Sequence, residues 1–133
     1  MITTLLFHGK VREFAVQNLD RCLSDCDVLD LLLQLVQSLK YEPYVKSPLA
    51  MFLLERALSN RTIGHFFFWH VRSEICGKSW LDARFALVLE SYCRGLCGHL
   101  KDLYKQVEAL EKLTMLADTL KEKRYETPRD RLK

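Results

Sequence analysis

The sequence predicts an all-α protein built from about six helices that pack as antiparallel pairs. Apolar residues recur at three- and four-residue steps through most of the chain, which is the period of an amphipathic helix. Alternation of apolar and polar residues is missing, and so are the Asn-Gly and Asp-Gly pairs typical of tight hairpins. Capping residues separate segments of about 15–20 residues, and the short turns between them favour antiparallel neighbours.

An amphipathic helix is predicted to begin at Lys10. Its inner face would carry Val11, Phe14, Ala15, Leu19, Cys22 and Leu23. Gly9 lies just before this helix and is expected to break the backbone, because glycine disfavours a helix interior. Residues 1–9 are therefore interpreted as a separate leader.

A second helix is predicted over residues 25–41. Ser24 and Asp27 have the spacing of a capping box, in which each side chain accepts a hydrogen bond from the backbone N–H of the other residue. Leucine and valine fill most positions and the polar residues form one narrow stripe, so we expect this helix to be mostly buried. Pro43 ends it, because a residue that precedes proline is pushed away from helical angles.

The third helix is expected to start at Ser47-Pro48, with serine as the cap and proline in the first turn. Asn60 can cap the next helix, predicted over residues 60–76, which contains the run Ile-Gly-His-Phe-Phe-Phe-Trp-His-Val. Its large apolar residues spread around most of the circumference, so other helices must cover it on several sides. This aromatic helix is predicted to be the centre of the fold, and Gly77 suits its C-terminal cap.

Two further helices complete the predicted fold. One is capped by Ser79 and ends near Cys97, and the other covers about residues 99–121. The inner face of the last helix would carry Leu100, Leu103, Val107, Leu110, Leu113 and Ala117. Residues 122–133 are charged and have little to bury, so we interpret them as a linker that follows a helical domain over residues 10–121. Helix pairs of about 40 residues match HEAT-type or armadillo-type repeats, which predicts a right-handed superhelix.

Composition and charge narrow the functional classes. A net charge of +3 is spread over mixed acids and bases, without the basic patch of a nucleic-acid interface. No signal peptide and no apolar run of about 20 residues is recognisable, so direct membrane insertion is not expected. Residues 121–133 hold six Lys/Arg and three Asp/Glu, which favours a solvated connector over a lipid-binding cluster. Five cysteines, an odd number, indicate free thiols in a cytoplasmic setting.

No catalytic or cofactor-binding residue is predicted. The five glycines are isolated from one another, so the sequence offers no phosphate-binding loop, and the His-Arg-Asp and Asp-Phe-Gly triplets of kinase active sites are missing. His65 and His70 are five residues apart and point to different sides of a helix. A shared metal or a proton relay through both is therefore not expected.

The cysteines are the only residues whose spacing raises the question of a metal. Cys22 with Cys26, and Cys93 with Cys97, have i, i+4 spacing, so each pair shares a helix face and four thiolates could hold zinc if the faces met. Both pairs lie among apolar positions, where cysteine typically acts as a small hydrophobe. We prefer this second interpretation and predict no metal site.

Several segments, taken in order, carry a resemblance. They are Lys10-Val-Arg-Glu-Phe-Ala-Val16, Leu33-Gln-Leu-Val-Gln-Ser-Leu-Lys-Tyr-Glu42, Phe52-Leu-Leu-Glu-Arg-Ala-Leu58, Ile63-Gly-His-Phe-Phe-Phe-Trp-His-Val-Arg-Ser-Glu74, Leu89-Glu-Ser-Tyr-Cys-Arg94 and Gln106-Val-Glu-Ala-Leu-Glu-Lys-Leu113. Together they resemble successive helices of the helical (PIK accessory) domain of class I phosphoinositide 3-kinase catalytic subunits, and their amino-acid sequence is most similar to the alpha type. The resemblance covers about Lys10 to Lys123.

The resemblance implies a non-catalytic scaffold within a phosphatidylinositol-4,5-bisphosphate 3-kinase, placed between the lipid- and Ras-binding modules and the kinase domain. The implied partners are the rest of that kinase chain and a Src-homology-containing regulatory subunit, and the implied setting is a cytoplasmic enzyme recruited to the plasma membrane. The family's acidic inhibitory loop and its ATP-binding and catalytic residues have no counterpart in this chain. No site residue is therefore carried over, and this partial domain is not expected to be an enzyme by itself. The alternative is a free-standing truncated α-solenoid that binds a protein partner as an adaptor.

Overall fold

The computed structural model describes residues 2–75, 77 and 80–126, and the side chains of residues 8–75, 77 and 80–124. The elements are α1 (Ile2–Cys22), α2 (Asp25–Ser38), the 3-10 turn η1 (Leu39–Tyr41), α3 (Pro48–Ser59), α4 (Arg61–Ser73), α5 (Trp80–Gly95) and α6 (His99–Glu126). Six α-helices and no strand occur within the described ranges, which confirms the all-α class. One compact unit, Met1–Cys97, contains α1 to α5, and a second, Gly98–Lys133, contains α6. The handedness of the superhelix stays a prediction.

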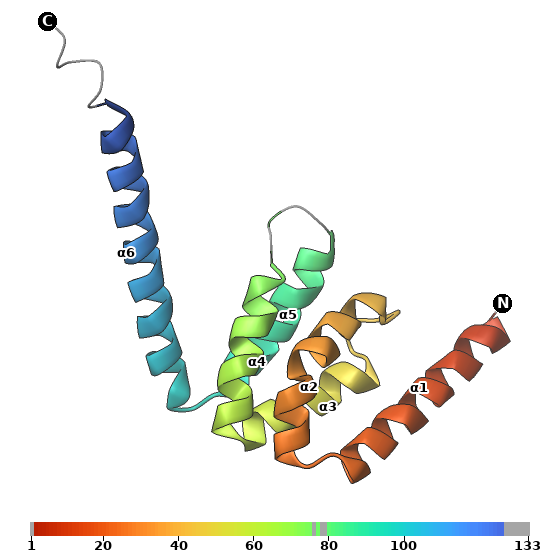
Figure 1. Ribbon diagram of the computed structural model, residues 1–133. Helices are drawn as coiled ribbons and strands as arrows, with labels where there is room; N and C mark the ends of the chain where they lie inside the picture. Colours follow the sequence, from red (N-terminus) through yellow and green to blue (C-terminus); the bar gives the residue numbers. More distant parts are fainter. Residues whose placement is uncertain (1, 76, 78–79, 127–133) are drawn as a thin grey trace, which may run out of the picture. The chain divides into compact units, whose positions relative to one another are not determined.

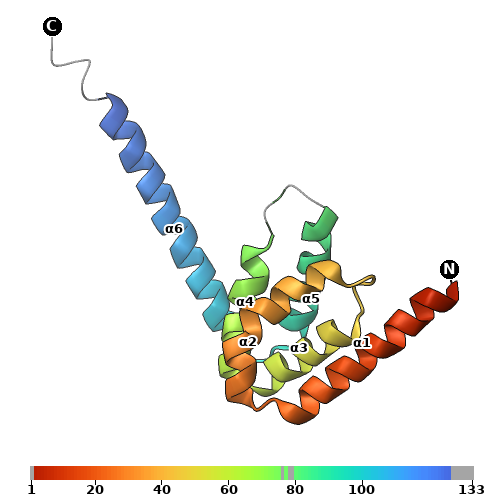
Figure 2. The same cartoon turned by 45° about the vertical axis from the view of Figure 1, so that its right-hand side comes forward.

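The aromatic helix α4 is the centre of the first unit, as predicted. It contacts α2, α3 and α5, and both ribbon views show these helices gathered around it (Figures 1 and 2). Its buried residues are Ile63, Gly64, Phe67, Phe68 and Val71. Phe66 is 47% exposed, so the expectation of cover around nearly the whole helix is wrong on that side. Three neighbouring helices leave one side of α4 open to solvent.

The predicted caps are confirmed where the structure describes them. Ser24 and Asp27 form the reciprocal capping box at the start of α2. The hydroxyl of Ser47 accepts a hydrogen bond from the N–H of Ala50, at 3.2 Å, and Pro48 occupies the first turn of α3. These local signals act within one turn of the chain, which explains why sequence alone predicts them.

The first and last helices extend beyond the limits predicted for them, while the division into leader, domain and linker stays a prediction. Helix α1 runs through Gly9 without a break, and a β-carbon added at Gly9 would meet no atom within 4 Å. One glycine in a helix costs only about 1 kcal/mol, which the residues on either side overcome. Helix α6 also continues through residues 122–126, part of the predicted linker, while residues 127–133 lie outside the described part.

The end of α4 also differs from the prediction. The helix ends at Ser73 with Glu74 as its C-cap in right-handed geometry, rather than near Cys76. Gly77 does adopt a positive φ of 73°, a conformation that favours glycine, but it lies in the connection beyond the cap. Cys76 and the predicted cap Ser79 lie outside the described residues.

The burial expected for several apolar residues is not found. Phe14 is 65% exposed, and Leu31 and Leu33 are also exposed. Helix α2 therefore buries one face only, which carries Val28, Leu32 and Val36. In α6, Leu110 and Leu113 are exposed although they were expected on an inner face. A unit of five helices has too few neighbours to cover both faces of its outer members, and α6 has no second helix within its own unit.

Candidate functional site: two arginine junctions and a cleft

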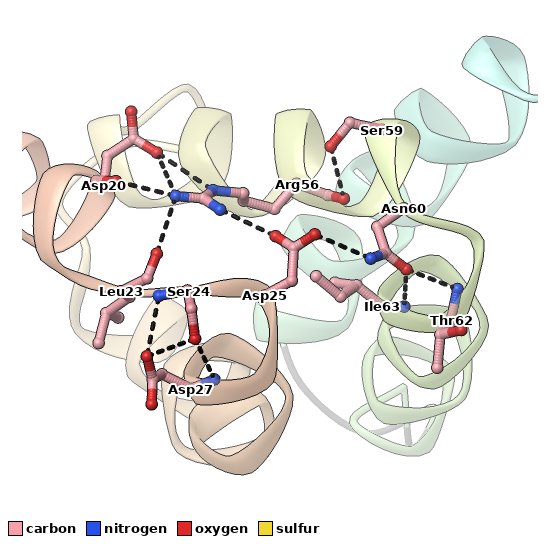
Figure 3. Close-up of polar contacts among 10 residues, drawn as sticks. All are labelled: Asp20, Leu23, Ser24, Asp25, Asp27, Arg56, Ser59, Asn60, Thr62 and Ile63. Carbon is pink, nitrogen blue, oxygen red and sulfur yellow. Dashed lines mark hydrogen bonds and ion pairs between the residues drawn. The ribbon is translucent and has the colours of Figure 1, made fainter.

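The first polar junction is centred on Arg56 of α3 (Figure 3). Its guanidinium bonds the carboxylate of Asp20 through Nε at 3.1 Å and Nη2 at 2.9 Å. Nη2 also donates to the carbonyl oxygens of Asp20, at 2.9 Å, and Leu23, at 3.2 Å. Asp20 lies in the last turn of α1 and Leu23 follows its end, where backbone acceptors lack helical donors. Arg56 thus caps α1 and fixes it against α3.

The same junction extends to the starts of α2 and α4. Arg56 Nη1 donates to Asp25 Oδ1 at 2.9 Å, and Asn60 Nδ2 donates to Asp25 Oδ2 at 2.9 Å. Asn60 Oδ1 in turn accepts from the N–H of Thr62 at 2.9 Å. Hydrogen bonds from Asn60 and then Arg56 lower the pKa of Asp25, so the carboxylate is ionised at neutral pH. The network joins α1, α2, α3 and α4 at one corner of the unit.

A second junction holds the segment that follows α2. Arg84 of α5 is 7% exposed, and its Nη1 donates to the carbonyl of Leu39 at 2.7 Å and to that of Glu42. From the other side, Arg12 of α1 donates through Nη1 to Glu42 Oε1 at 2.9 Å and to the Tyr41 carbonyl at 3.2 Å. Two arginines from distant parts of the chain therefore satisfy the carbonyls at the end of the α2–η1 segment.

An open cleft adjoins this second junction. It lies between residues 8–13 of α1 and residues 41–48, and its volume is about 720 Å³. Volumes of about 300–1,000 Å³ are usual for ligand sites. Tyr41 and Tyr44 line the cleft and are 78% and 66% exposed, while Glu42 lies in it with a side chain only 9% exposed.

The residues considered for metal binding do not gather. Cys22, Cys26 and Cys97 are exposed free thiols, so their interpretation as small buried hydrophobes is wrong. Cys93 is half-buried, and burial raises the pKa of its thiol. Among the described residues no group of three or more His, Cys, Asp or Glu side chains could hold a metal ion.

The two histidines of α4 both contact one aromatic ring. Phe66 makes an edge-on contact with His65 at 5.5 Å between ring centroids and stacks on His70 at 6.4 Å. Burial lowers the pKa of His70, which favours its neutral form. The two imidazoles flank Phe66 at the open side of the helix.

The polar junctions were missed by sequence reasoning. In the sequence Arg12, Arg56 and Arg84 look like ordinary surface charges of amphipathic helices, because their partners in the junctions lie 29 or more residues away along the chain. One signal was available. Arg84 lies at i, i+4 to Val88 on the face of α5 that is otherwise apolar, and a charge at such a position indicates a buried partner.

None of the helices in the described part of the chain combines the length and the hydrophobicity needed to cross a bilayer. The arrangement supplies packing surfaces, ionic contacts and the cleft beside α1. Its ionisable groups in the two junctions hold helices together through hydrogen bonds to backbone carbonyls and carboxylates.

Comparison with known proteins places these helices in a family. Residues 5–105 match the family described as "Phosphoinositide 3-kinase family, accessory domain (PIK domain)". The chain is 48% identical over 112 residues to Phosphatidylinositol 3-kinase 1 of Dictyostelium discoideum, and 45% identical over 113 residues to Phosphatidylinositol 3-kinase 2 of the same organism. Each match covers 84% of this chain but only 7% and 6% of the respective relative. The chain therefore belongs to the phosphoinositide 3-kinase family, and its matched residues correspond to the helical accessory (PIK) domain.

Proposed function

We propose that the chain is a non-catalytic scaffold segment of a phosphatidylinositol-4,5-bisphosphate 3-kinase catalytic subunit, which positions the kinase domain against the lipid- and Ras-binding domains. The whole enzyme would act in the cytoplasm and be recruited to the plasma membrane. A Src-homology-containing regulatory subunit would be a further partner of that enzyme. The alpha type is the proposed isoform.

The observation that carries this proposal is the apolar surface left open on the outer helices. Val11 and Phe14 of α1 lie at i, i+3 and are exposed, as are Leu31 and Leu33 of α2. Burying a large apolar side chain contributes about 1.5–3 kcal/mol, so such faces favour contact with another packed element. Relatives more than ten times as long as this chain offer such elements.

A chimera tests the positioning role. The chain would replace the matching 112-residue segment of Phosphatidylinositol 3-kinase 1, and lipid-kinase activity and thermal stability would be measured. Phe14→Ser is expected to change the unfolding free energy of the chain alone by no more than about 0.5 kcal/mol, because Phe14 is mostly exposed there. In the chimera the same substitution should lower stability and activity, because it removes a buried contact.

Gln106→Ser is the control, since Gln106 is polar and exposed and lies on α6 rather than on the face of α1 that carries Phe14. It should leave both proteins unchanged. A chimera in which Phe14→Ser behaves like Gln106→Ser would contradict the proposed role and would favour the free-standing adaptor.

A further inference from the structure

The cleft beside α1 contains a buried acceptor that no neighbour satisfies. Glu42 Oε1 is paired with Arg12, but Oε2 is buried and has no hydrogen-bond partner among the described residues. An unpaired buried carboxylate oxygen costs free energy that an incoming donor would recover. Since Oε2 is buried, a donor in the cleft reaches it only after the carboxylate turns about its terminal torsion, which is broad in glutamate.

The charges around the cleft select the kind of donor. Arg12 already neutralises Glu42 through the 2.9 Å ion pair. Lys10 and Lys46 add two more positive charges to the lining, against one further acid, Glu13. A cationic ligand would be repelled by this excess, so the preferred donor is an uncharged N–H or O–H group.

The remaining lining favours an aromatic body on that donor. Tyr41 and Tyr44 flank Pro43, and the two tyrosine rings are exposed at the cleft. Exposed tyrosines are enriched at protein–protein contacts, where they pack against other aromatic rings and prolines. Tryptophan joins a large apolar body to a single N–H donor, which matches the tyrosine and proline rings of the lining and the unsatisfied oxygen of Glu42.

We propose that this cleft is a docking site for a tryptophan side chain carried by a protein partner, with the indole N–H donating to Glu42 and the ring packed against Tyr41 and Tyr44. The site is independent of the scaffold role, because it uses residues 8–13 of α1 and residues 41–48 rather than the exposed faces of Phe14 and Leu33.

A titration with two matched probes tests the hydrogen bond. N-acetyl-tryptophan amide and its 1-methylindole analogue, which lacks the N–H donor, would each be added to the chain and followed by amide chemical shifts. The tryptophan probe should bind with a Kd on the order of 1 mM, since a single side chain supplies few contacts. Loss of one hydrogen bond should weaken the methylated probe about five- to tenfold. The shifted amides should lie in residues 8–13 and 41–48.

Substitutions locate the site without disturbing the core. Tyr44→Ser should weaken binding of the tryptophan probe at least threefold, since an aromatic contact of this kind contributes about 1 kcal/mol. Tyr104→Ser is the control, because Tyr104 of α6 is 69% exposed, close to the 66% of Tyr44. Glu42→Gln should narrow the difference between the two probes, since a neutral amide accepts more weakly than a carboxylate.

Four outcomes would each overturn the proposal. They are equal affinity for both tryptophan probes, tighter binding of N-acetyl-arginine amide, shifts that map outside the two lining segments, and no saturable shift up to about 10 mM probe.

Discussion

Gly64 offers the sharpest test of how closely the helices of the first unit pack. A β-carbon added there would lie 2.5 Å from the carbonyl oxygen of Ala57 in α3, and closer still to the hydroxyl of Tyr92 in α5. Real β-carbons essentially never approach other atoms this closely. Gly64→Ala must therefore push α4 away from its neighbours, because a backbone carbonyl cannot swing aside as a flexible side chain does.

Two opposing effects determine how much Gly64→Ala changes the free energy of unfolding. Overpacking a close-packed interior costs about 1–3 kcal/mol, and the backbone contact with Ala57 points to the upper end. Replacing glycine by alanine within a helix recovers about 1 kcal/mol. The expected net loss in unfolding free energy is thus about 2 kcal/mol, which lowers the urea midpoint by about 1 M for a typical slope.

Urea unfolding followed by circular dichroism measures this loss, and Gly9→Ala is the matched control. A β-carbon at Gly9 meets nothing within 4 Å, so only the helix-propensity gain of about 0.5–1 kcal/mol should appear. Adding Tyr92→Phe to Gly64→Ala should restore part of the loss, because the hydroxyl contact disappears while the carbonyl contact remains. If Gly64→Ala were as stable as the parent chain, or gained as much as Gly9→Ala, the close approach of α3, α4 and α5 would be refuted.

Three other expectations follow from the polar and titratable groups. Arg56→Ala should lower the unfolding free energy by about 1–2 kcal/mol, because it removes a hydrogen bond to a carbonyl of α1 as well as the ion pairs. Arg94→Ala breaks an exposed i, i+4 ion pair and should cost under about 0.5 kcal/mol. Burial raises the pKa of Tyr92 from 10.0 to about 12, so the stability that its neutral side chain contributes is complete below pH 10 and should be lost as the pH rises toward 12. Tyr92→Phe should remove this loss from the pH profile of thermal unfolding. In a thiol-reagent assay Cys97 should react faster than Cys93, since Cys97 is exposed while burial raises the pKa of Cys93, and equal rates would contradict the burial of Cys93.

The features that sequence predicted well are those governed by local chemistry. The caps Ser24, Ser47 and Asn60 could be predicted because each capping hydrogen bond spans at most three residues. The aromatic run in α4 also predicted the centre of the unit, because side chains as large and apolar as Phe67 and Phe68 are strongly stabilised by burial. Long-range partners were not predictable in this way. The sequence does not show that Arg84 would reach the carbonyl of Leu39, since that contact depends on where the packing of α5 against α3 and α4 places Arg84 relative to η1.

Burial was the other weak point of the sequence-based prediction. Periodicity shows which residues share a face of α1 and α2, but it does not show whether that face is covered within the chain or by something outside it. Phe14 and Leu33 fit the apolar pattern and are nevertheless exposed. The same mismatch supports the proposal that these faces pack against the remainder of a longer kinase.

Amide hydrogen exchange along α1 tests the scaffold proposal most directly. It would be measured in the chain alone and in the chimera with Phosphatidylinositol 3-kinase 1 described above. If other parts of the kinase cover the face that carries Val11 and Phe14, exchange in α1 should slow by about tenfold or more in the chimera. Equal exchange in the two proteins would contradict the proposal that this helix packs against the rest of the enzyme.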